Sequence, residues 1–171
     1  ELAGQANSRL QLSPGQRQQL LTLNLLTVDE PLILYQLQQE SDVSRTTILK
    51  DLDLIEAWTE TFDLLLERRP NFGFLLTGSE YQKRQAITAV LWGDVPFGDS
   101  LMRMSHSVGL VYELANDAEL MPLARHVNQL VDKWQTEQTM PLVSFAEGQL
   151  NGRFTDNAVL YLALTIAIQQ Q

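Results

Sequence analysis

The first half of the chain carries the hydrophobic spacing of α-helices, together with residues that begin and end them. Ser13 followed by Pro14 predicts the start of one helix, since serine caps exposed N–H groups and proline is tolerated at the first helical position. Asp29 and Pro31 predict the start of a second helix in the same way. The segment "ESDV" (40–43) is a short polar turn that separates this helix from the next one.

A third helix is predicted after Ser44, which has a side chain suited to a helix cap. Its apolar residues follow one stripe with a 3.6-residue period, and they are Ile48, Leu52, Ile55 and Phe62. The opposite side presents a small polar face near the start of the helix. This face consists of Thr46, Lys50 and Ala57, with Thr47 and Leu54 beside them.

Two short apolar strands follow, "DLLLE" (63–67) and "FGFLLTG" (72–78), joined by the turn "RRPNFG" (68–73), which is rich in turn-forming residues. Ser79 and Gln82 then have the spacing of a capping box, which predicts a further helix. Three short helices followed by a hairpin are the plan of a winged helix-turn-helix.

The second half of the chain is predicted to be helical throughout. The segment "WGDVPFGD" (92–99) breaks the preceding helix and marks a domain boundary. Helices are expected near 99–115 and 118–135, and a third, capped near Thr155, runs through the apolar segment 158–168. No strand pattern is recognised there. The predicted fold class is therefore mainly α, a winged helix-turn-helix followed by a helical bundle.

The chain is acidic, with a formal charge of −9 that is spread evenly along it. Residues 13–90 carry a net charge of −4, and residues 91–171 carry a net charge of −5. There is no basic tail, so any contact with nucleic acid has to come from a local patch. The absence of cysteine excludes disulfides and thiolate metal sites, and it fits the expected cytoplasmic location.

No apolar run reaches the roughly 18 residues needed to cross a bilayer, so no membrane association is predicted. The beginning of the chain lacks the basic region and apolar core of a signal peptide. It does not start with Met, and its final residues, "AIQQQ", stop without a helix cap. These features are typical of a piece of a longer protein.

The sequence carries no pattern typical of a catalytic site, and we predict no enzyme activity and no cofactor. It has no glycine-rich phosphate loop, no "GxSxG", and no spaced carboxylates with a histidine. The two histidines, His106 and His126, are isolated, which argues against a metal site. His126 falls on the polar side of its predicted helix and is expected to be exposed. The three tryptophans fall on or beside apolar stripes and are expected to pack in the core.

Two segments carry a more specific signal, "VSRTTILKDLDLIEAW" (43–58) and "LLLERRPNFGFLLTGSEYQKRQAI" (64–87). Together they resemble the second winged helix of bacterial transcriptional activators that carry regulation domains of the phosphotransferase system (PRDs). That family is related to BglG-type antiterminators and Mga-type regulators. The resemblance implies the end of a preceding winged helix at 1–12, a winged helix-turn-helix at 13–92, a connecting helix at 93–117, and the start of a PRD at 118–171.

The segment "FTDNAVLYLALTIAI" (154–168) is similar to the family's apolar helix that bears a phosphorylatable histidine. This chain has Thr165 at that place, and Gln169–Gln171 stand where an arginine is expected. Thr165 cannot be phosphorylated as a histidine is. Either the domain is degenerate at its first site or its helix aligns differently.

The first functional hypothesis is a DNA-binding activator of carbohydrate-utilisation genes. Its expected partners are double-stranded DNA, a second copy bound through the helical part, and phosphotransferase-system proteins that contact regions outside this chain. The alternative is a winged helix without DNA contact that relays signals or mediates dimerisation. Net negative charge, Asp53 and the apolar Leu54 favour the alternative. The residues predicted to contact DNA are Ser44, Arg45, Thr46, Thr47, Lys50, Arg68, Arg69 and Asn71.

Overall fold

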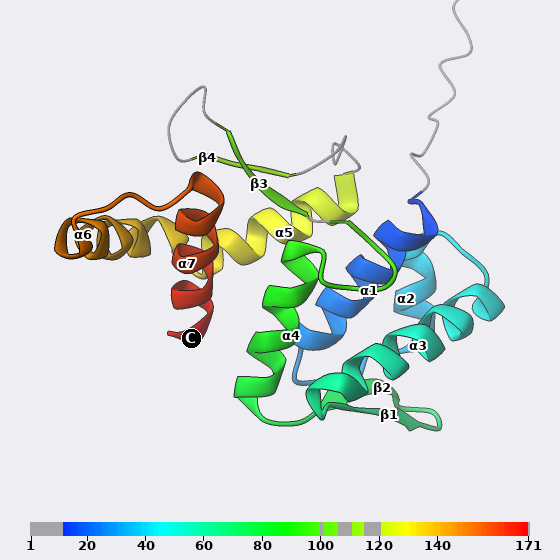
Figure 1. Ribbon diagram of the computed structural model, residues 1–171. Coiled ribbons are helices and arrows are strands. Elements are labelled where there is room, and N and C mark those ends of the chain that lie inside the picture. Colours follow the sequence, from blue (N-terminus) through cyan, green and yellow to red (C-terminus); the bar gives the residue numbers. More distant parts are fainter. Residues whose placement is uncertain (1–11, 100, 106–110, 115–120, 171) are drawn as a thin grey trace, which may run out of the picture.

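The computed structural model describes residues 12–99, 101–105, 111–114 and 121–170, and it is mainly helical (Figure 1). This confirms the predicted class. The helices are α1 (Pro14–Thr27), α2 (Leu34–Ser41), α3 (Arg45–Thr59), α4 (Glu80–Trp92), α5 (Met121–Lys133), α6 (Met140–Leu150) and α7 (Asp156–Gln169), with short 3-10 turns η1 (Glu60–Phe62) and η2 (Thr136–Thr139). Two antiparallel hairpins join β1 (Leu65–Arg69) to β2 (Gly73–Thr77) and β3 (Met102–Ser105) to β4 (Val111–Leu114).

The helix starts predicted at serine and threonine residues are confirmed. Ser13 and Ser79 each form a complete capping box, with Gln16 and Gln82 as the second member. Thr155 caps α7 by accepting a hydrogen bond from the backbone N–H of Ala158 at 3.3 Å. These caps satisfy N–H groups that have no partner inside the helix.

The second helix was placed wrongly, because α2 begins only after Ile33. The residues expected to form its first turn are extended, and Leu32 pairs with Phe74 of β2. Two backbone hydrogen bonds of 2.9 Å join these residues, one in each direction. The short extended segment before α2 therefore lies along the first hairpin. Its pairing with β2 holds the start of α2 next to that hairpin.

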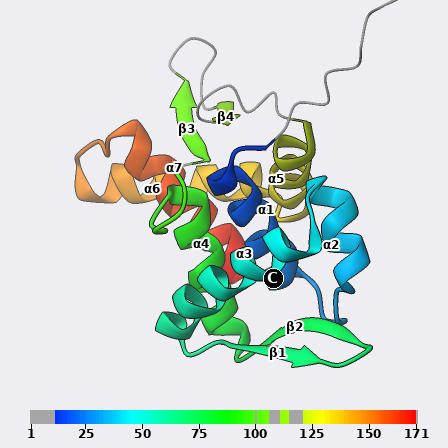
Figure 2. The same ribbon diagram turned by 90° about the vertical axis from the view of Figure 1, so that its right-hand side faces the viewer.

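The first hairpin lies beneath α3 and α2 at the lower edge of the molecule (Figure 2). Its register pairs Leu66 with Leu76 and Arg69 with Gly73. Pro70 and Asn71 form its turn, and Asn71 adopts a φ of 64°, a left-handed conformation that asparagine tolerates. The tip therefore has a defined backbone and presents polar residues to solvent.

A single large core runs through both halves of the chain. The predicted stripe on α3 is confirmed, since Ile48, Leu52 and Ile55 are fully buried. Phe62 lies beyond the end of α3, in η1, and is half-buried. The same cluster contains α1 leucines and extends to residues of α5 and α7, among them Leu123, Val127, Leu160 and Leu164. The loop at 92–99 therefore ends α4 without dividing the core.

The helix expected within 93–117 is wrong where the structure describes this segment. Residues 102–105 and 111–114 are the strands β3 and β4, with Met102 paired to Leu114 and Met104 to Tyr112. The sequence explains this difference, because Met102 and Met104 alternate with Arg103 and Ser105, which is the two-residue period of a strand. The wing strand expected before residue 12 lies outside the described residues.

The helices α5 and α7 lie where the sequence places them, and α6 was not anticipated. The helix α6 packs with α7 around a second small core of Val143, Val159 and Ala163. Its N-terminus has Pro141 in the first turn, the position where proline is tolerated. Leu142, Phe145 and Leu150 of α6 remain exposed.

Candidate nucleic-acid interface

The first two turns of α3 expose two cations and one hydroxyl. Arg45, Thr46 and Lys50 are exposed, and Thr46 and Lys50 lie on the side of the helix opposite its buried stripe. Within the described part of the chain, neither Arg45 nor Lys50 forms an ion pair. Both cations are thus available to an anionic partner.

Ser44 and Thr47 hold the end of this helix in place. The Ser44 hydroxyl accepts a hydrogen bond from the backbone N–H of Thr47 at 3.2 Å, and the two hydroxyl oxygens lie 3.0 Å apart. The sequence assigned both residues to DNA contact. The two hydroxyls bond to each other, and the Ser44 hydroxyl also accepts from the backbone, which is the geometry of a helix cap.

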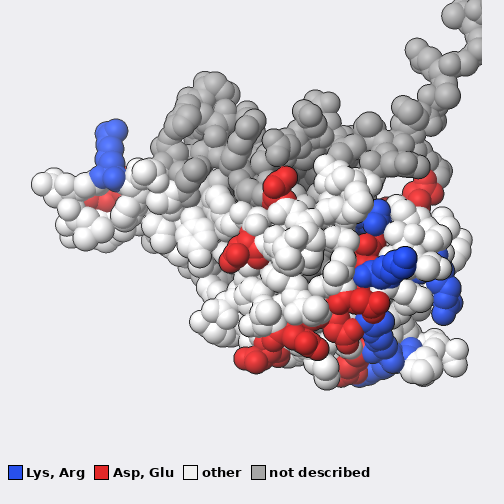
Figure 3. Space-filling model, turned by 45° about the vertical axis from the view of Figure 1, so that its right-hand side comes forward, with Lys and Arg blue, Asp and Glu red and all other residues white. Residues whose placement is uncertain are grey.

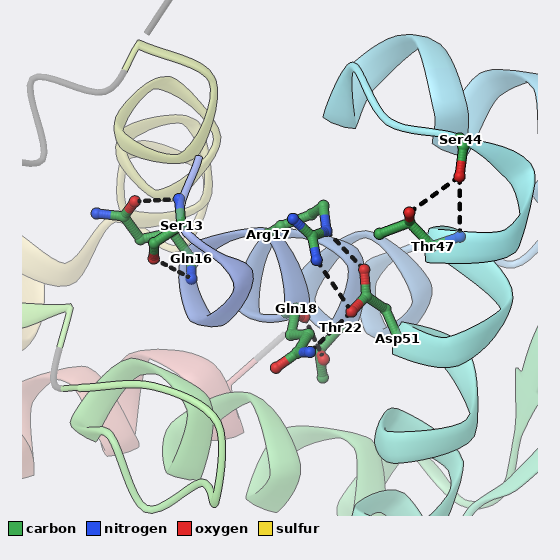
Figure 4. A network of polar contacts seen from close by, with 8 residues as sticks. All are labelled: Ser13, Gln16, Arg17, Gln18, Thr22, Ser44, Thr47 and Asp51. Atoms are coloured by element: carbon green, nitrogen blue, oxygen red, sulfur yellow. Dashed lines mark hydrogen bonds and ion pairs between the residues drawn. The ribbon is translucent and has the colours of Figure 1, made fainter. Parts of the chain in front are cut away.

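A buried ionic network fixes α3 against α1 (Figure 4). The Arg17 guanidinium donates to both carboxylate oxygens of Asp51, at 2.6 and 3.2 Å, and the Gln18 side chain donates to the same carboxylate at 2.7 Å. Arg17 is only 7% exposed and Asp51 only 3%. This network was not predicted from the sequence, although Asp51 falls next to Leu52 of the apolar stripe. A charged residue beside the buried stripe was the signal in the sequence that pointed to a buried ionic partner.

The arginines of the hairpin are paired with carboxylates. Arg68 donates to Asp53 of α3 at 2.6 Å and also to Glu56 of the same helix. Burial alone would lower the pKa of the Arg68 guanidinium, but these hydrogen bonds and negative charges outweigh burial and raise it. Arg69 donates to its neighbour Glu67 at 2.7 Å. Arg68 therefore ties the hairpin to α3.

A groove of about 640 Å³ separates the hairpin from α2 and the start of α3. Four of the predicted contact residues line it, namely Arg45, Arg68, Arg69 and Asn71. The other four, Ser44, Thr46, Thr47 and Lys50, lie on the first two turns of α3 or at its cap, outside the lining. The structure thus brings residues from two distant segments to one concave surface.

The aromatic residues of this surface were not identified from the sequence. Tyr35 lines the groove and is 66% exposed, and Phe72 at the hairpin tip is 70% exposed. Phe72 lies two residues after Pro70 in the turn and Tyr35 is the second residue of α2, and neither position predicts exposure from the sequence.

Charges of both signs gather around the groove. Figure 3 shows Lys and Arg side chains at the lower right, over the start of α3 and the hairpin, with Asp and Glu side chains directly beside them. The acidic neighbours include Asp53, Glu56 and Glu67. The surface therefore carries little net charge, and its two cations without an ion pair to a described residue, Arg45 and Lys50, lie on the first two turns of α3.

His126 on α5 is half-buried, which corrects the expectation of an exposed residue. Its Nε2 atom is buried and has no hydrogen-bond partner among the described residues. Burial lowers the pKa of this imidazole below its ordinary value of 6.5. His106 lies outside the described residues.

The lowered pKa predicts a loss of stability in mild acid. Below pH 6.5 the unfolded chain takes up a proton at His126 that the folded chain resists, so the free energy of unfolding falls as the pH drops through that value. Thermal unfolding between pH 7.5 and 5.5 should show a smaller decline for His126→Gln than for the wild type. Glu40, whose pKa is raised by desolvation, is common to both proteins, so its contribution cancels. Equal declines would contradict the prediction.

Neither a cluster of metal ligands nor a membrane-spanning helix is found among the described residues. The described residues contain no group of three or more potential metal ligands. Within the same residues, no helix is long and apolar enough to span a bilayer. Trp58 and Trp134 are buried as expected, and Trp92 is half-buried.

Comparison with known proteins gives two partial similarities. Over 83 residues the chain is 34% identical to the probable licABCH operon regulator of Bacillus subtilis and 31% identical to the transcriptional regulator ManR of the same organism. Each match covers 48% of this chain and 13% of the relative. No protein-family model matches the chain, and no solved structure matches it. Over about half its length, the chain is similar to a small part of two much longer bacterial transcriptional regulators.

Proposed function

We propose that this chain is part of a transcriptional regulator and that residues 13–92 form a winged helix-turn-helix that contacts duplex DNA. In this proposal α3 is the recognition helix and the β1–β2 hairpin is the wing. The observation that carries it is the pair of exposed cations Arg45 and Lys50 on the first two turns of α3, which form no ion pair with any described residue. The similarity to two transcriptional regulators supports the same class of function.

The proposed DNA contacts fall into two groups. Arg45, Thr46 and Lys50 would reach the major groove from the first two turns of α3, because arginine and lysine donate to guanine and to phosphate. Arg69 and Asn71 follow the DNA backbone from the wing. Arg68, which is held by two carboxylates of α3, positions the wing instead of pairing with a phosphate.

The part of the proposal that concerns the regulated genes and their control rests on the resemblance in sequence. We propose control of carbohydrate utilisation through the phosphotransferase system, with the regulatory phosphorylation outside this chain, since Thr165 stands in the histidine's place. A homodimer that forms through the helical part would present two copies of α3 to a palindromic site.

Because only two or three cations per chain are proposed to contact phosphates, the DNA affinity should depend only weakly on salt. With two or three phosphate contacts per chain, log Kobs should fall against log [salt] with a slope of about −2 to −3. Fluorescence anisotropy with a labelled duplex at 50–200 mM salt measures this slope. The triple variant Arg45→Ala/Lys50→Ala/Arg69→Ala should lose binding. Removing the same number of positive charges far away, in Arg125→Ala/Lys133→Ala/Arg153→Ala, should leave it nearly unchanged. Equal losses in the two variants would refute the proposed surface.

One observation favours a second candidate function, a winged helix that contacts another protein. Arg68 is neutralised by Asp53 and Glu56, and the apolar residue Leu54, which follows Asp53 in α3, is exposed. The variant Asp53→Asn/Glu56→Gln separates the two candidates. If the surface binds DNA, freeing Arg68 should tighten binding and steepen the salt slope by about one. An interaction module would show no DNA binding with or without this change.

A further inference from the structure

Asn151 and Gly152 form an exposed Asn–Gly pair where α6 ends. Asn151 is the C-cap of this helix and adopts a left-handed conformation, with φ 50° and ψ 41°. Both residues are exposed, as is every residue in the range 148–153. Among the described residues, a Cβ atom built on Gly152 would meet the Leu150 carbonyl oxygen at 3.9 Å and nothing closer, so no neighbouring segment crowds this pair.

An Asn–Gly pair carries its own chemistry. The backbone nitrogen of the second residue can attack the side-chain amide carbon of the asparagine, and glycine favours the attack because it has no Cβ to obstruct it. A bond forms from the nitrogen to Cγ, the nitrogen loses its proton to solvent, and ammonia leaves. Water then opens the cyclic imide to aspartate or to isoaspartate. Nothing is oxidised or reduced, and water is the co-reactant.

The folded end of α6 restrains this reaction. The Gly152 N–H donates to the carbonyl oxygen of Glu147 at 3.2 Å, and the Asn151 N–H donates to that of Gly148 at 3.4 Å. These bonds satisfy carbonyl groups at the helix end and hold the nitrogen that has to attack. Opening of the last turn releases that nitrogen. Because the residues of this turn are already exposed, opening uncovers little buried surface and has a low cost in free energy.

The first hairpin contains a matched asparagine that is not followed by glycine. Asn71 is also exposed and left-handed, with a φ of 64°. The N–H of the next residue, Phe72, also donates to a carbonyl oxygen, that of Arg69, at 3.0 Å. Asn71 and Asn151 therefore share their backbone region, their exposure and a bonded N–H on the following residue. They differ in the side chain that follows.

We propose that Asn151 is a site of spontaneous deamidation, and that opening of the last turn of α6 controls its rate. The product adds a negative charge at the C-terminal end of a helix, where the helix dipole disfavours it. Isoaspartate also lengthens the backbone by a methylene group at the cap. Modification therefore weakens the end of α6, a helix that packs on α7. This site is independent of DNA binding, and its test contains no DNA.

Peptide mass spectrometry tests the site on the whole chain, incubated at mildly alkaline pH and digested with trypsin at intervals. Asn151 is the sole asparagine of the tryptic peptide 134–153, as Asn71 is of the peptide 69–83, so each conversion is measured separately. Asn151 should convert at least about tenfold faster than Asn71, which corresponds to about 1.4 kcal/mol in activation free energy. Gly152→Ala should remove this difference. Equal rates at Asn151 and Asn71, or an unchanged rate at Asn151 in Gly152→Ala, would overturn the proposal.

Gly148→Ala tests whether the opening of α6 controls the rate. A Cβ atom at residue 148 meets nothing within 4 Å, so alanine fits the helix without a clash. Alanine should slow the conversion of Asn151 by about two- to fivefold, which is its advantage of about 0.5–1 kcal/mol over glycine in a helix. Asn71 is the internal control and should convert at an unchanged rate. An unchanged rate at Asn151 would overturn the control by helix opening.

Hydrogen exchange measures the effect of the modification on the helix end. In the isoaspartyl protein, separated by anion exchange, the amide of Gly152 should exchange faster than in fresh protein. Asn151→Asp carries the new charge without the longer backbone and should show a smaller increase. Equal exchange at Gly152 in the fresh and isoaspartyl proteins would show that modification leaves the end of α6 intact, against the proposal.

Discussion

Replacing Asp51 with alanine is expected to lower the free energy of unfolding by about 3–5 kcal/mol, the cost of removing one partner from a buried ion pair. The Arg17 guanidinium would remain buried without its carboxylate, and the Gln18 side chain would lose its acceptor as well. Loss of this size is a large part of the stability of a typical domain. Urea unfolding followed by circular dichroism measures it.

Asp53→Ala is the matched control, because it removes the same group from the exposed side of the same helix. Asp53 pairs with Arg68 at the surface, so its loss should cost less than about 1 kcal/mol. Substituting both buried partners in Arg17→Met/Asp51→Leu should recover much of the stability lost in Asp51→Ala, since apolar residues can replace a buried pair. Similar losses in Asp51→Ala and Asp53→Ala would contradict the buried network.

Replacing Gly73 with alanine is expected to destabilise the first hairpin strongly. Gly73 has a φ of 119°, and a Cβ atom there would lie 2.3 Å from the carbonyl oxygen of Leu32. The backbone conformation alone costs a residue with a side chain about 1–3 kcal/mol. Relief of the contact requires Leu32 to move away from the hairpin, so the two hydrogen bonds between Leu32 and Phe74 would also be lost.

The measurement is hydrogen exchange at the Leu32 and Phe74 amides together with thermal unfolding. Both amides should exchange faster in Gly73→Ala, and the melting temperature should fall. Gly148→Ala is the control, since a Cβ there meets nothing within 4 Å and the residue lies in helix α6. Alanine in that helix should raise stability by about 0.5–1 kcal/mol. Unchanged protection at Leu32 in Gly73→Ala would show that the bridge does not depend on this glycine.

Local features of the fold could be predicted from the sequence, and contacts between distant segments could not. The caps at Ser13, Ser44 and Ser79 and the buried stripe of α3 depend on residues within a turn or two of one another. The pairing of Leu32 with Phe74 joins residues more than forty positions apart and overrides a helix signal at Asp29 and Pro31. The β3–β4 hairpin was missed because a helical period was fitted to an alternating segment.

The same distinction applies to the candidate site. The exposure of Thr46 and Lys50 follows from their position opposite the apolar stripe, as the helical period of the sequence predicts. The pairing of Arg68 with Asp53 depends on how the hairpin folds back on α3, which no spacing along the chain reveals. For this reason two adjacent arginines looked equivalent in the sequence and have different partners in the structure.

The continuous core has a consequence for how this segment can be recombined with others in evolution or in the laboratory. Because α1 packs on both α3 and α5, and α4 packs on α7, the two halves share buried surface instead of meeting at a linker. A chimaera joined at residues 92–99 would expose leucines of α1 and α4 unless the incoming half carried matching apolar residues. Fusion partners should therefore be attached before α1 or after α7, where the shared packing stays intact.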